Sequence, residues 1–524
     1  MENHGTETNK RDGANTSIWQ SALADHPASD YSDYQEVYDA LIIGGGITGI
    51  TTALLLQKQG KKCLLVEAKN LGFGTTGGTT AHLNTFLDTT YPEIDSAFSK
   101  EASSLMAKGA KKMIEMISTN IRELKIDADF EFKAAYLFSQ NEKETEELQS
   151  ILESSQTAGI EVSEVFENGV PIPFEHVLCF KNQAQFHPLK YITGLAKEFE
   201  RLGGKIIEQT FIHSTELRED IHYAKSDKFT FKAKNIVYAT HIPPGINILS
   251  LRNAPYRSYV LAVKLNSGEY PDSLAYDMQE PYHYFRSHEI DGQKYLIIGG
   301  ADHKTGHEDP IKAFEDLESY ARTYFDISQI DFRWSSQYYV PVDGLPYIGH
   351  LPGSDKGIFV ATGFNGNGMI LGSLSAVLLS DLILGKENPY EKLLSPSRLK
   401  PISGFTEFVK ENADVAYHFV ADRFGAEIIR STGELANDEG KIVEFDGKKL
   451  ALYKDDTGEI TALNPVCTHA GCIVDWNPTE KTWDCPCHGG RFSITGKVLN
   501  GPPQKDLEVI PVNEIDSPKN VQKK

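Results

Sequence analysis

The chain has 524 residues, of which 40% are hydrophobic, 10% aromatic and 24% charged. These proportions are typical of globular proteins and the length leaves room for about three domains, so a disordered chain and a single small module are both excluded. The formal net charge of −21 would repel a phosphate backbone, and no local basic patch interrupts it, so nucleic-acid binding is not expected.

The N-terminal residues and the apolar segments indicate where in the cell the protein is expected. Residues 1–36 form a polar extension without the basic start and apolar run of a secretory signal, which predicts a cytoplasmic protein. The longest apolar stretch, residues 369–385, is interrupted by serines and an aspartate. Because it is too short and too polar to span a bilayer, no transmembrane anchor is expected.

A β-α-β unit opens the patterned part of the chain. An apolar strand over residues 37–43 is followed by a glycine turn, a helix over residues 50–57 and a second strand over residues 63–66. Residues 100–160 have the pattern of helices with charged faces. Residues 206–240 and 255–300 alternate apolar and polar side chains, which predicts antiparallel strands of a second, interleaved domain.

The sequence pattern of the C-terminal third changes twice, first to a linker and then to short strands. A short strand over residues 357–361 leads through a glycine-rich turn into an apolar helix from about Met369. Residues 395–426 then form a linker rich in proline and serine with an amphipathic helix over residues 404–423. Residues 427–516 have short strands and glycine turns, which predicts a small all-β domain.

The turn of the β-α-β unit carries Gly44, Gly46 and Gly49 with the spacing G-x-G-x-x-G. The first glycine permits a tight turn, the second lets backbone N–H groups approach a pyrophosphate, and the third lets the helix pack closely on the sheet. Glu67 follows the second strand, where a carboxylate accepts hydrogen bonds from a ribose and disfavours a 2′-phosphate. These residues predict a dinucleotide site without distinguishing FAD from NAD.

The choice between FAD and NAD rests on a resemblance to a known family. Residues 37 to about 390 resemble the D-amino-acid oxidase-like family of FAD-dependent oxidoreductases, which includes glycine and sarcosine oxidases. The resemblance implies FAD, held by an α/β Rossmann-like domain with an interleaved α+β substrate domain over residues 37–394. The matching pieces are the Gly44 turn and residues 74–81, 237–240, 343–349 and 361–369.

In that family the last two pieces flank the isoalloxazine ring. Small residues there let the backbone approach a flat ring, and the positive end of the helix from Met369 would stabilise an anionic reduced flavin. Without the family, a glycine turn before an apolar helix indicates packing alone. The resemblance thus implies these further cofactor-binding residues: Thr75, Thr76, Thr80, Gly363, Asn365, Gly366, Gly368 and Met369.

Substrate residues are less well defined. His82 either lines the pocket as a hydrogen-bonded histidine or attaches FAD covalently, as in some relatives of the family. Arg257, Tyr282, Tyr284 and Arg286 lie in segments that form the substrate side of the pocket in related enzymes, where an arginine could hold a carboxylate through two parallel hydrogen bonds. Alternatively, the tyrosines fill a sheet face and the arginines pair with local acids. No residue is assigned a catalytic role.

Four of the six cysteines fall within 21 consecutive positions, which favours a metal site over a distributed disulfide framework. Cys467 and His469 read C-x-H, and fifteen residues later Cys485 and His488 read C-x-x-H. This pattern resembles the Rieske iron-sulfur family. The resemblance implies a 2Fe-2S cluster with both cysteines on one iron and both histidines on the other.

Two further cysteines, Cys472 and Cys487, favour an iron-sulfur cluster over a zinc ion at this motif. Zinc would also accept two cysteines and two histidines, but it predicts no use for this pair. In the Rieske proteins of respiratory and photosynthetic complexes the matching pair forms a disulfide that braces the two cluster loops. Disulfides are unusual in the cytosol, so the bond is a weaker expectation than the cluster.

One departure from the Rieske pattern concerns the reduction potential. High-potential members have serine and tyrosine hydroxyls after the last histidine, where this chain has Gly490 and Phe492. Without these donors the reduced cluster is less stabilised, which predicts a potential in the lower part of the range of roughly −150 to +300 mV. The departure and the lack of an anchor argue against docking on a cytochrome bc complex. A dioxygenase is not expected, because no two-histidine, one-carboxylate iron site is recognised after the cluster motif.

The two cofactors form a chemical pair. A flavin removes two electrons together from a C–N bond, whereas a Rieske cluster carries one electron at a time. The combination predicts an FAD-dependent dehydrogenase that oxidises a small amine or amino acid and passes electrons through the cluster to an unknown acceptor, a protein or a quinone. Two alternatives stay open: a non-catalytic electron carrier or redox sensor between partner proteins, and an oxygen-using amine oxidase.

Overall fold

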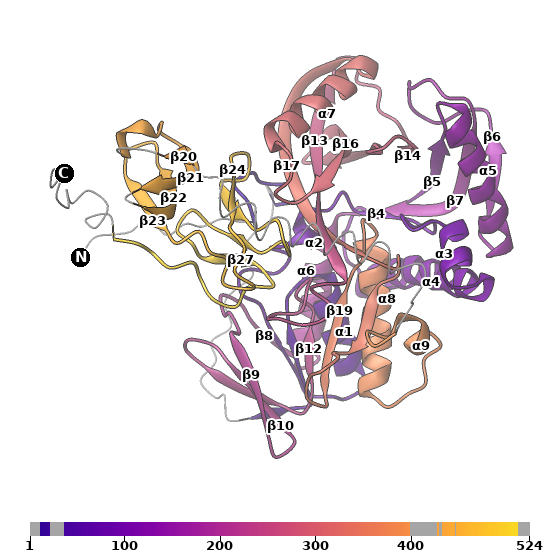
Figure 1. Ribbon diagram of the computed structural model, residues 1–524. Coiled ribbons are helices and arrows are strands. Elements are labelled where there is room, and N and C mark those ends of the chain that lie inside the picture. Colours follow the sequence, from indigo (N-terminus) through magenta and orange to yellow (C-terminus); the bar gives the residue numbers. More distant parts are fainter. Residues whose placement is uncertain (1–10, 21–35, 399–426, 429–431, 446, 512–524) are drawn as a thin grey trace.

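The computed structural model describes residues 11–20, 36–398, 427–428, 432–445 and 447–511. The helix predicted over residues 404–423 and most of the predicted linker lie outside these residues. Figure 1 shows a central α/β part that contains α1, α8 and β12, a second part that contains α7, β13 and β17, and a C-terminal part that contains β20–β27. The described helices are α1 (Ile47–Lys58), α2 (Thr75–Gly78), α3 (Tyr91–Ala97), α4 (Lys100–Leu124), α5 (Glu142–Thr157), α6 (Pro188–Arg201), α7 (Pro310–Tyr324), α8 (Gly368–Ile383) and α9 (Glu391–Leu394).

The central sheet has the strand order β18-β19-β12-β2-β3-β8, and its pairs are parallel except for β18 with β19. Alternate residues of β2 pack on opposite faces: Ile42 contacts the core with α1 and α8, and Leu41 contacts the core beneath a smaller sheet. Burial on both faces explains the unbroken apolar run in the sequence. The strands are β2 (Ala40–Ile43), β3 (Cys63–Val66), β8 (Lys205–Ile207), β12 (Ile236–Tyr238), β18 (Tyr347–His350) and β19 (Ile358–Thr362).

The predicted first strand is divided into two. β1 (Val37–Tyr38) ends before Asp39 and pairs with β11 in the smaller sheet, whose order is β1-β11-β10-β9. The parallel strands β8 and β12 also correct the expectation that residues 206–240 belong wholly to an antiparallel second domain. The remaining strands of the smaller sheet are β9 (Ser214–Arg218), β10 (Ile221–Lys225) and β11 (Thr230–Ala233).

The second domain is built on a sheet of order β17-β13-β16-β15-β14-β5-β7-β4, with β6 beside β7. The antiparallel strands predicted over residues 255–300 are confirmed here, and α7 packs against β13 and β16. The helical prediction for residues 100–160 is wrong at β5, which separates α4 from α5. The strands are β4 (His82–Leu83), β5 (Glu131–Phe138), β6 (Val162–Val165), β7 (Val177–Gln185), β13 (Asn253–Leu265), β14 (Leu274–Asp277), β15 (Tyr284–Ile290), β16 (Gln293–Lys304) and β17 (Ile327–Pro341).

The C-terminal domain is all-β, as predicted. One sheet has the order β20-β21-β22-β23 and the other the order β24-β25-β26-β27. The cysteines of the cluster motif belong to its buried core, together with Trp483 and Phe492. The elements are β20 (Glu427–Ile428), a 3₁₀ turn (Thr432–Glu434), β21 (Glu439–Phe445), β22 (Lys448–Lys454), β23 (Ile460–Leu463), β24 (Asp475–Asn477), β25 (Thr482–Asp484), β26 (Arg491–Phe492) and β27 (Val498–Asn500).

Part of the predicted N-terminal extension is integral to the fold. Residues 11–20 are mostly buried, and Ile18 and Trp19 are 0% exposed. The Trp19 ring packs edge-on against His187 and His288, with ring centroids 5.0 and 4.9 Å away. The polar composition of residues 1–36 as a whole concealed this short buried segment.

A buried network of charges joins residues 11–20 to both neighbouring domains. Arg11 binds Glu480 at 2.8 Å, and Arg491 binds Asp12 at 2.8 Å. The other oxygen of Glu480 accepts hydrogen bonds from the backbone N–H and the hydroxyl of Ser335, at 2.8 and 2.6 Å. Because these groups are almost fully buried, each charge depends on its partners for the solvation that it has lost.

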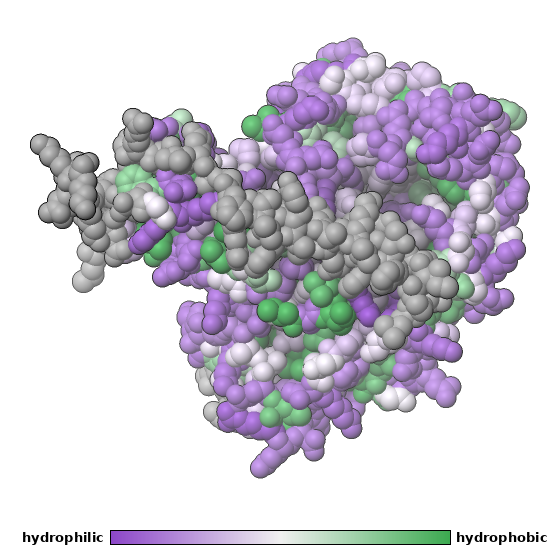
Figure 2. Space-filling model, viewed as in Figure 1, coloured by the Kyte–Doolittle hydropathy of each residue, from purple (hydrophilic) through white to green (hydrophobic). Residues whose placement is uncertain are grey.

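The outer surface is mainly polar. Figure 2 shows a largely hydrophilic face, with hydrophobic side chains in small groups. Among the described helices, none has the length and apolar character needed to cross a membrane.

Candidate functional site: a dinucleotide cavity beside a cysteine-histidine centre

A cavity of about 1150 Å³ opens where the central sheet meets the second domain. Most of the predicted cofactor residues line it, whereas Gly49 and Gly363 do not. Gly49 has a packing role, because a Cβ there would lie 1.9 Å from the carbonyl oxygen of Gly44. The lining residues among those predicted for the cofactor are Gly44, Gly46, Glu67, Thr75, Thr76, Thr80, Asn365, Gly366, Gly368 and Met369.

The glycine turn fits a pyrophosphate. Gly44 has φ +112°, and a Cβ on it would lie 2.4 Å from the carbonyl oxygen of Ala239, so only glycine is accommodated. Gly46 caps α1 without a side-chain hydrogen bond. The first-turn N–H groups and the positive end of the helix dipole therefore stand at the cavity, where they suit a bound phosphate.

Glu67 is fixed at the cavity wall. Its carboxylate accepts hydrogen bonds from the backbone N–H groups of Gly45 at 2.6 Å and Lys69 at 2.8 Å. Burial raises the pKa of Glu67, while these two hydrogen bonds oppose the rise. Backbone donors thus orient the carboxylate that the sequence assigns to the ribose.

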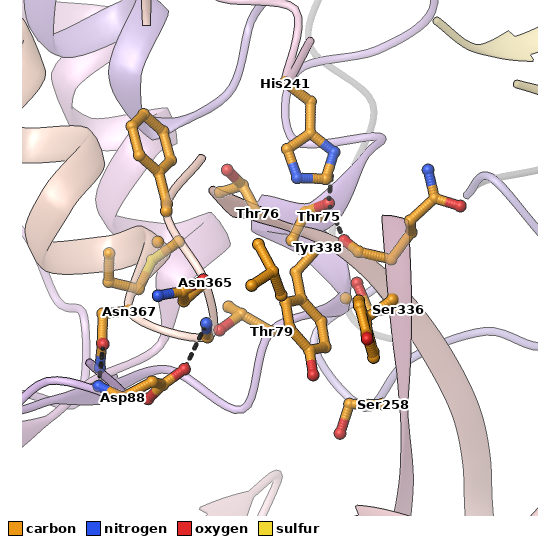
Figure 3. Close-up of a pocket in the computed structure, with 18 of the residues that line it drawn as sticks. Thr75, Thr76, Thr79, Asp88, His241, Ser258, Ser336, Tyr338, Asn365 and Asn367 are labelled. Carbon is orange, nitrogen blue, oxygen red and sulfur yellow. Dashed lines mark hydrogen bonds between the residues drawn. The ribbon is translucent and has the colours of Figure 1, made fainter. Parts of the chain in front are cut away.

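Hydrogen bonds connect the turn before α8 to the segment around Asp88. The Asp88 carboxylate accepts a hydrogen bond from the backbone N–H of Gly366 at 2.6 Å, and the Asn367 side-chain oxygen accepts one from the backbone N–H of Asp88 at 2.7 Å. Figure 3 shows Asp88, Asn365 and Asn367 on one side of the cavity, facing Tyr338 and Ser258. Burial among the cavity walls raises the pKa of Asp88 to about 6.

His82 belongs to a hydrogen-bonded chain in the cavity wall. The Asn84 amide donates to the Tyr276 hydroxyl at 2.7 Å, and that hydroxyl lies 2.7 Å from Nδ1 of His82. Either the hydroxyl or Nδ1 can donate this hydrogen bond, according to the tautomer of the imidazole. Burial, together with the charge of Arg286, holds the pKa of His82 well below its usual range. His82 is therefore a neutral imidazole that lines the cavity.

The two predicted arginines do not serve the cavity. Arg257 donates to the Ser335 hydroxyl and lies 3.7 Å from Glu480, whereas Arg286 donates to the carbonyl oxygens of Thr80 and Ala81. Neither lines the cavity, so the interpretation in which one of them holds a substrate carboxylate gains no support from their positions. Both guanidinium groups are buried, and each is directed toward acceptors elsewhere in the wall.

The substrate side is lined instead by tyrosines and an acid. Tyr282 and Tyr284 line the cavity, as does Tyr338, whose hydroxyl donates to Asp302 at 2.8 Å. The Ser258 and Tyr284 hydroxyls are 2.7 Å apart. Burial raises the pKa of Asp302 to about 7. Sequence reasoning missed Asp88, Asp302 and Tyr338, because nothing in their local pattern distinguishes them from ordinary strand and loop residues.

The cysteine-histidine motif converges at the tips of two loops in the C-terminal domain. Cys467 and Cys485 are buried free thiols, and the rings of His469 and His488 lie 4.8 Å apart. Both nitrogens of each ring are buried, and none has a hydrogen-bond partner. Buried polar atoms without partners are costly, so this donor set fits a bound metal centre with two sulfur and two nitrogen ligands.

A disulfide bond connects Cys472 and Cys487, with their Cα atoms 6.6 Å apart. The Sγ atoms of these two residues and of Cys485 lie within 4.8 Å of one another. Because the disulfide uses Cys472 and Cys487, Cys485 is the cysteine of these three that can bind the metal centre. The pair therefore links the two loops that carry the proposed ligands.

The two sites share a wall. The Tyr339 hydroxyl donates to the backbone carbonyl of His488 at 3.1 Å, and its ring packs edge-on against His241, which lines the cavity, at 4.7 Å. Gln337 donates to the carbonyl of Gly489 at 2.9 Å. Residues 498–501 and Pro503 of the C-terminal domain also line the cavity.

Comparisons with known proteins agree with these two sites. Residues 39–382 match the family described as FAD dependent oxidoreductase, and residues 427–511 match the Rieske [2Fe-2S] domain. The YhfW protein of Bacillus subtilis (strain 168), named as a Rieske 2Fe-2S iron-sulfur protein, is 35% identical over 475 residues, which cover 90% of this chain and 93% of that protein.

More distant relatives match either the oxidoreductase part or the Rieske part of the chain. Gamma-glutamylputrescine oxidoreductase of Escherichia coli (strain K12) is 21% identical and covers 74% of this chain and 93% of its own length. A crystal structure of glycine oxidase from Geobacillus kaustophilus has a TM-score of 0.58 at 20% identity, and covers 70% of this chain and all of that one. Iron-sulfur subunit 2 of the cytochrome b6-f complex of Cyanophora paradoxa is 44% identical over 71 residues, which are 14% of this chain and 30% of that subunit.

The cavity, its glycine turn and the paired thiol and imidazole ligands are thus those of known families, which imply FAD and a 2Fe-2S cluster as the cofactors. The chain belongs to the FAD-dependent oxidoreductases related to amine and amino-acid oxidases, and it carries a C-terminal Rieske domain.

Proposed function

We propose that this protein is an amine dehydrogenase in which electrons leave the flavin through the Rieske cluster, one at a time, to an external one-electron acceptor. Oxidation of a CH–NH group to C=N releases two electrons and two protons, so each turnover requires two successive one-electron transfers. FAD supplies the two-electron oxidation and the cluster supplies the one-electron transfer. The names of the relatives, glycine oxidase and gamma-glutamylputrescine oxidoreductase, point to amines or amino acids as the substrate class.

One observation carries the proposal: residues of the Rieske domain form part of the wall of the flavin cavity. Residues 498–501 and Pro503 line it, and Tyr339 connects the carbonyl of His488 to His241 on the cavity side. This junction is buried, since Tyr339 is 1% exposed. Short, packed contacts of this kind favour transfer between two fixed cofactors over transfer between two mobile domains.

The burial of the cluster histidines bears on where an external acceptor could dock. The four ring nitrogens of His469 and His488 are buried, and His488 belongs to the loop whose next residue packs against the second domain: a Cβ on Gly489 would lie 2.6 Å from Pro255. An external acceptor docking at these ring edges would need the two domains to separate. We therefore expect the acceptor to approach another side of the cluster.

Anaerobic rapid mixing of the holoenzyme with a panel of amines and amino acids tests the proposal. The expected result is bleaching of the flavin absorbance, followed by the electron paramagnetic resonance signal of the reduced cluster. A cluster that stays oxidised after the flavin is reduced would refute the relay. Stoichiometric peroxide formation in air, without any effect of an artificial one-electron acceptor on turnover, would instead identify an oxidase.

A further inference from the structure

We propose that the substrate half of the cavity recognises an alkylamine that carries a second positive charge and no carboxylate, with Asp302 and Asp88 as its ammonium-binding residues. This inference rests on the proposed function, because it names a substrate class for the same cavity. It is carried by the charges on the cavity wall, by buried acceptors without partners, and by the aromatic lining.

The charges of the wall disfavour a substrate carboxylate. Among the described residues, Lys69 is the lysine that lines the cavity, and it stands beside Glu67 at the dinucleotide end; no arginine lines it. Two parallel hydrogen bonds from an arginine, the usual way to hold a carboxylate, are therefore not provided. Acidic side chains are numerous by comparison: Asp88, Glu93, Glu147, Asp277, Glu280 and Asp302 line the same cavity.

Asp302 presents an unused acceptor. One carboxylate oxygen accepts the hydrogen bond from Tyr338 at 2.8 Å, whereas the other, Oδ1, is buried and has no partner. A buried acceptor left unpaired costs free energy, and an ammonium N–H would satisfy it. Burial raises the pKa of Asp302 to about 7, opposed by the Ser258 and Tyr338 hydroxyls and reinforced by Asp88.

Asp88 provides the second anionic position. Its carboxylate lies on the side of Gly366 and Asn367, across the cavity from the Tyr338 that binds Asp302 (Figure 3). Asp88 also disfavours the ionisation of Asp302, so the two carboxylates interact through the cavity. A ligand with one cation near each of them would stabilise both in the charged form.

An independent observation points to a hydrogen-bond donor as the ligand. Asn84 lines the cavity and is 5% exposed; its amide nitrogen donates to Tyr276, while its side-chain oxygen is buried and has no partner. In this orientation of the amide the oxygen is the free acceptor. An ammonium or amine N–H matches it, and a carboxylate does not.

The aromatic lining suits the rest of such a molecule. The rings of Tyr282 and Tyr284 lie 5.7 Å apart, and those of Tyr256 and Tyr338 lie 6.0 Å apart. All four residues line the cavity. Their faces attract cations and their edges pack against alkyl chains, so they complement a hydrocarbon spacer between two charged nitrogens.

The test measures binding without turnover. A short alkyl diamine in which each carbon beside nitrogen carries two methyl groups has no C–H bond at that carbon, so it cannot be oxidised to an imine, yet it keeps its ammonium N–H groups. Isothermal titration calorimetry of the holoenzyme should show that this diamine probe binds about tenfold or more tightly than the matching monoamine of equal length, which lacks one ionic contact. The matching amino acid, which carries a carboxylate in place of the second ammonium, should bind more weakly still.

Matched variants assign the effect to the two acids. D302N and D88N should each weaken binding of the diamine probe about tenfold or more, while D291N, a change of the same kind in the exposed turn between β15 and β16, should leave its affinity unchanged. Flavin absorbance per protein in each variant reports whether the cavity is intact, and D302E should recover part of the affinity.

Two results would overturn the inference: equal affinity for the diamine, monoamine and amino-acid probes, or tight binding of the diamine probe to D302N and D88N with full flavin content. The outcome is separable from that of the relay. A protein that binds the dication but never reduces its cluster would refute the proposed function and leave this inference standing.

Discussion

The hydroxyl of Tyr339 donates a hydrogen bond to the backbone carbonyl of His488, at 3.1 Å. The preceding residue on β17, Tyr338, donates to Asp302 in the substrate half of the cavity. Consecutive residues of a strand point to opposite faces, so one pair of tyrosines contacts the substrate side and the cluster side at once. This alternation places the two sites on either side of a single strand.

The first prediction concerns the passage of electrons through this strand. Y339F keeps the ring against His241 but removes the hydrogen bond to His488, so we expect the cluster to be reduced several-fold more slowly while flavin reduction keeps its rate. Anaerobic stopped-flow absorbance separates the two phases. The control is Y338F, which should weaken substrate binding and leave the second phase unchanged; the reverse assignment of the two phases would contradict the prediction.

The second prediction concerns the reduction potential of the cluster. A Cβ on Gly490 would lie 3.6 Å from Sγ of Cys467, so position 490 stands beside this sulfur without offering it a hydroxyl, and Phe492 is fully buried in the same core. Adding a hydroxyl by F492Y should stabilise the reduced form by about 1 kcal/mol, which raises the potential by about 40 mV for one electron. Redox titration followed by circular dichroism measures it. An unchanged potential with an intact cluster would show that this position does not reach the sulfur.

The third prediction concerns the charge network between the domains. E480Q removes a buried charge that contacts Arg11, Arg257 and Ser335, and we expect the free energy of unfolding to fall by about 3 to 5 kcal/mol. Urea unfolding followed by tryptophan fluorescence measures the loss. E318Q, which removes a partly exposed acid paired with Arg322, should cost no more than about 1 kcal/mol. Equal losses in the two variants would mean that the buried network is not specially stabilising.

The fourth prediction concerns the pH dependence of cation binding. The pKa values of Asp302 and Asp88 are raised to about 7 and about 6, so both carboxylates are charged above these values and neutral below them. The affinity for the diamine probe, whose ammonium groups stay protonated over this range, should therefore be highest near pH 8 and fall tenfold or more by about pH 5. In D302N the part of the decline near pH 7 should disappear. Affinity that rises as the pH falls would contradict the assignment.

Much of the architecture is encoded locally. The glycine turn between β2 and α1, the apolar strands buried on both faces and the C-x-H and C-x-x-H motifs are short-range patterns. Each reflects a physical requirement that a few neighbouring residues meet: close backbone approach, burial, or soft metal ligands at fixed spacing. A dinucleotide site and a metal site follow from them, the family resemblances imply FAD and a 2Fe-2S cluster, and the comparisons confirm the families.

The substrate wall could not be predicted in this way. Arg257 and Arg286 have the chemistry for binding a carboxylate, but the fold directs them to Ser335 and to the carbonyls of Thr80 and Ala81. Asp302, more than 200 residues from Asp88 in the chain, faces the same cavity. Which side chain reaches a cavity depends on strand register and on long-range packing, and the local pattern contains neither.

The sequence by itself determined the cofactors and the class of chemistry, because glycine turns and metal ligands act through residues close together in the chain. Only the tertiary structure decided how the two halves are joined. The buried segment of residues 11–20, the contact of Tyr339 with His488 and the acidic cavity wall all combine residues that are more than a hundred positions apart. Such contacts form because folding excludes water from them, and the free energy of that burial depends on the whole molecule.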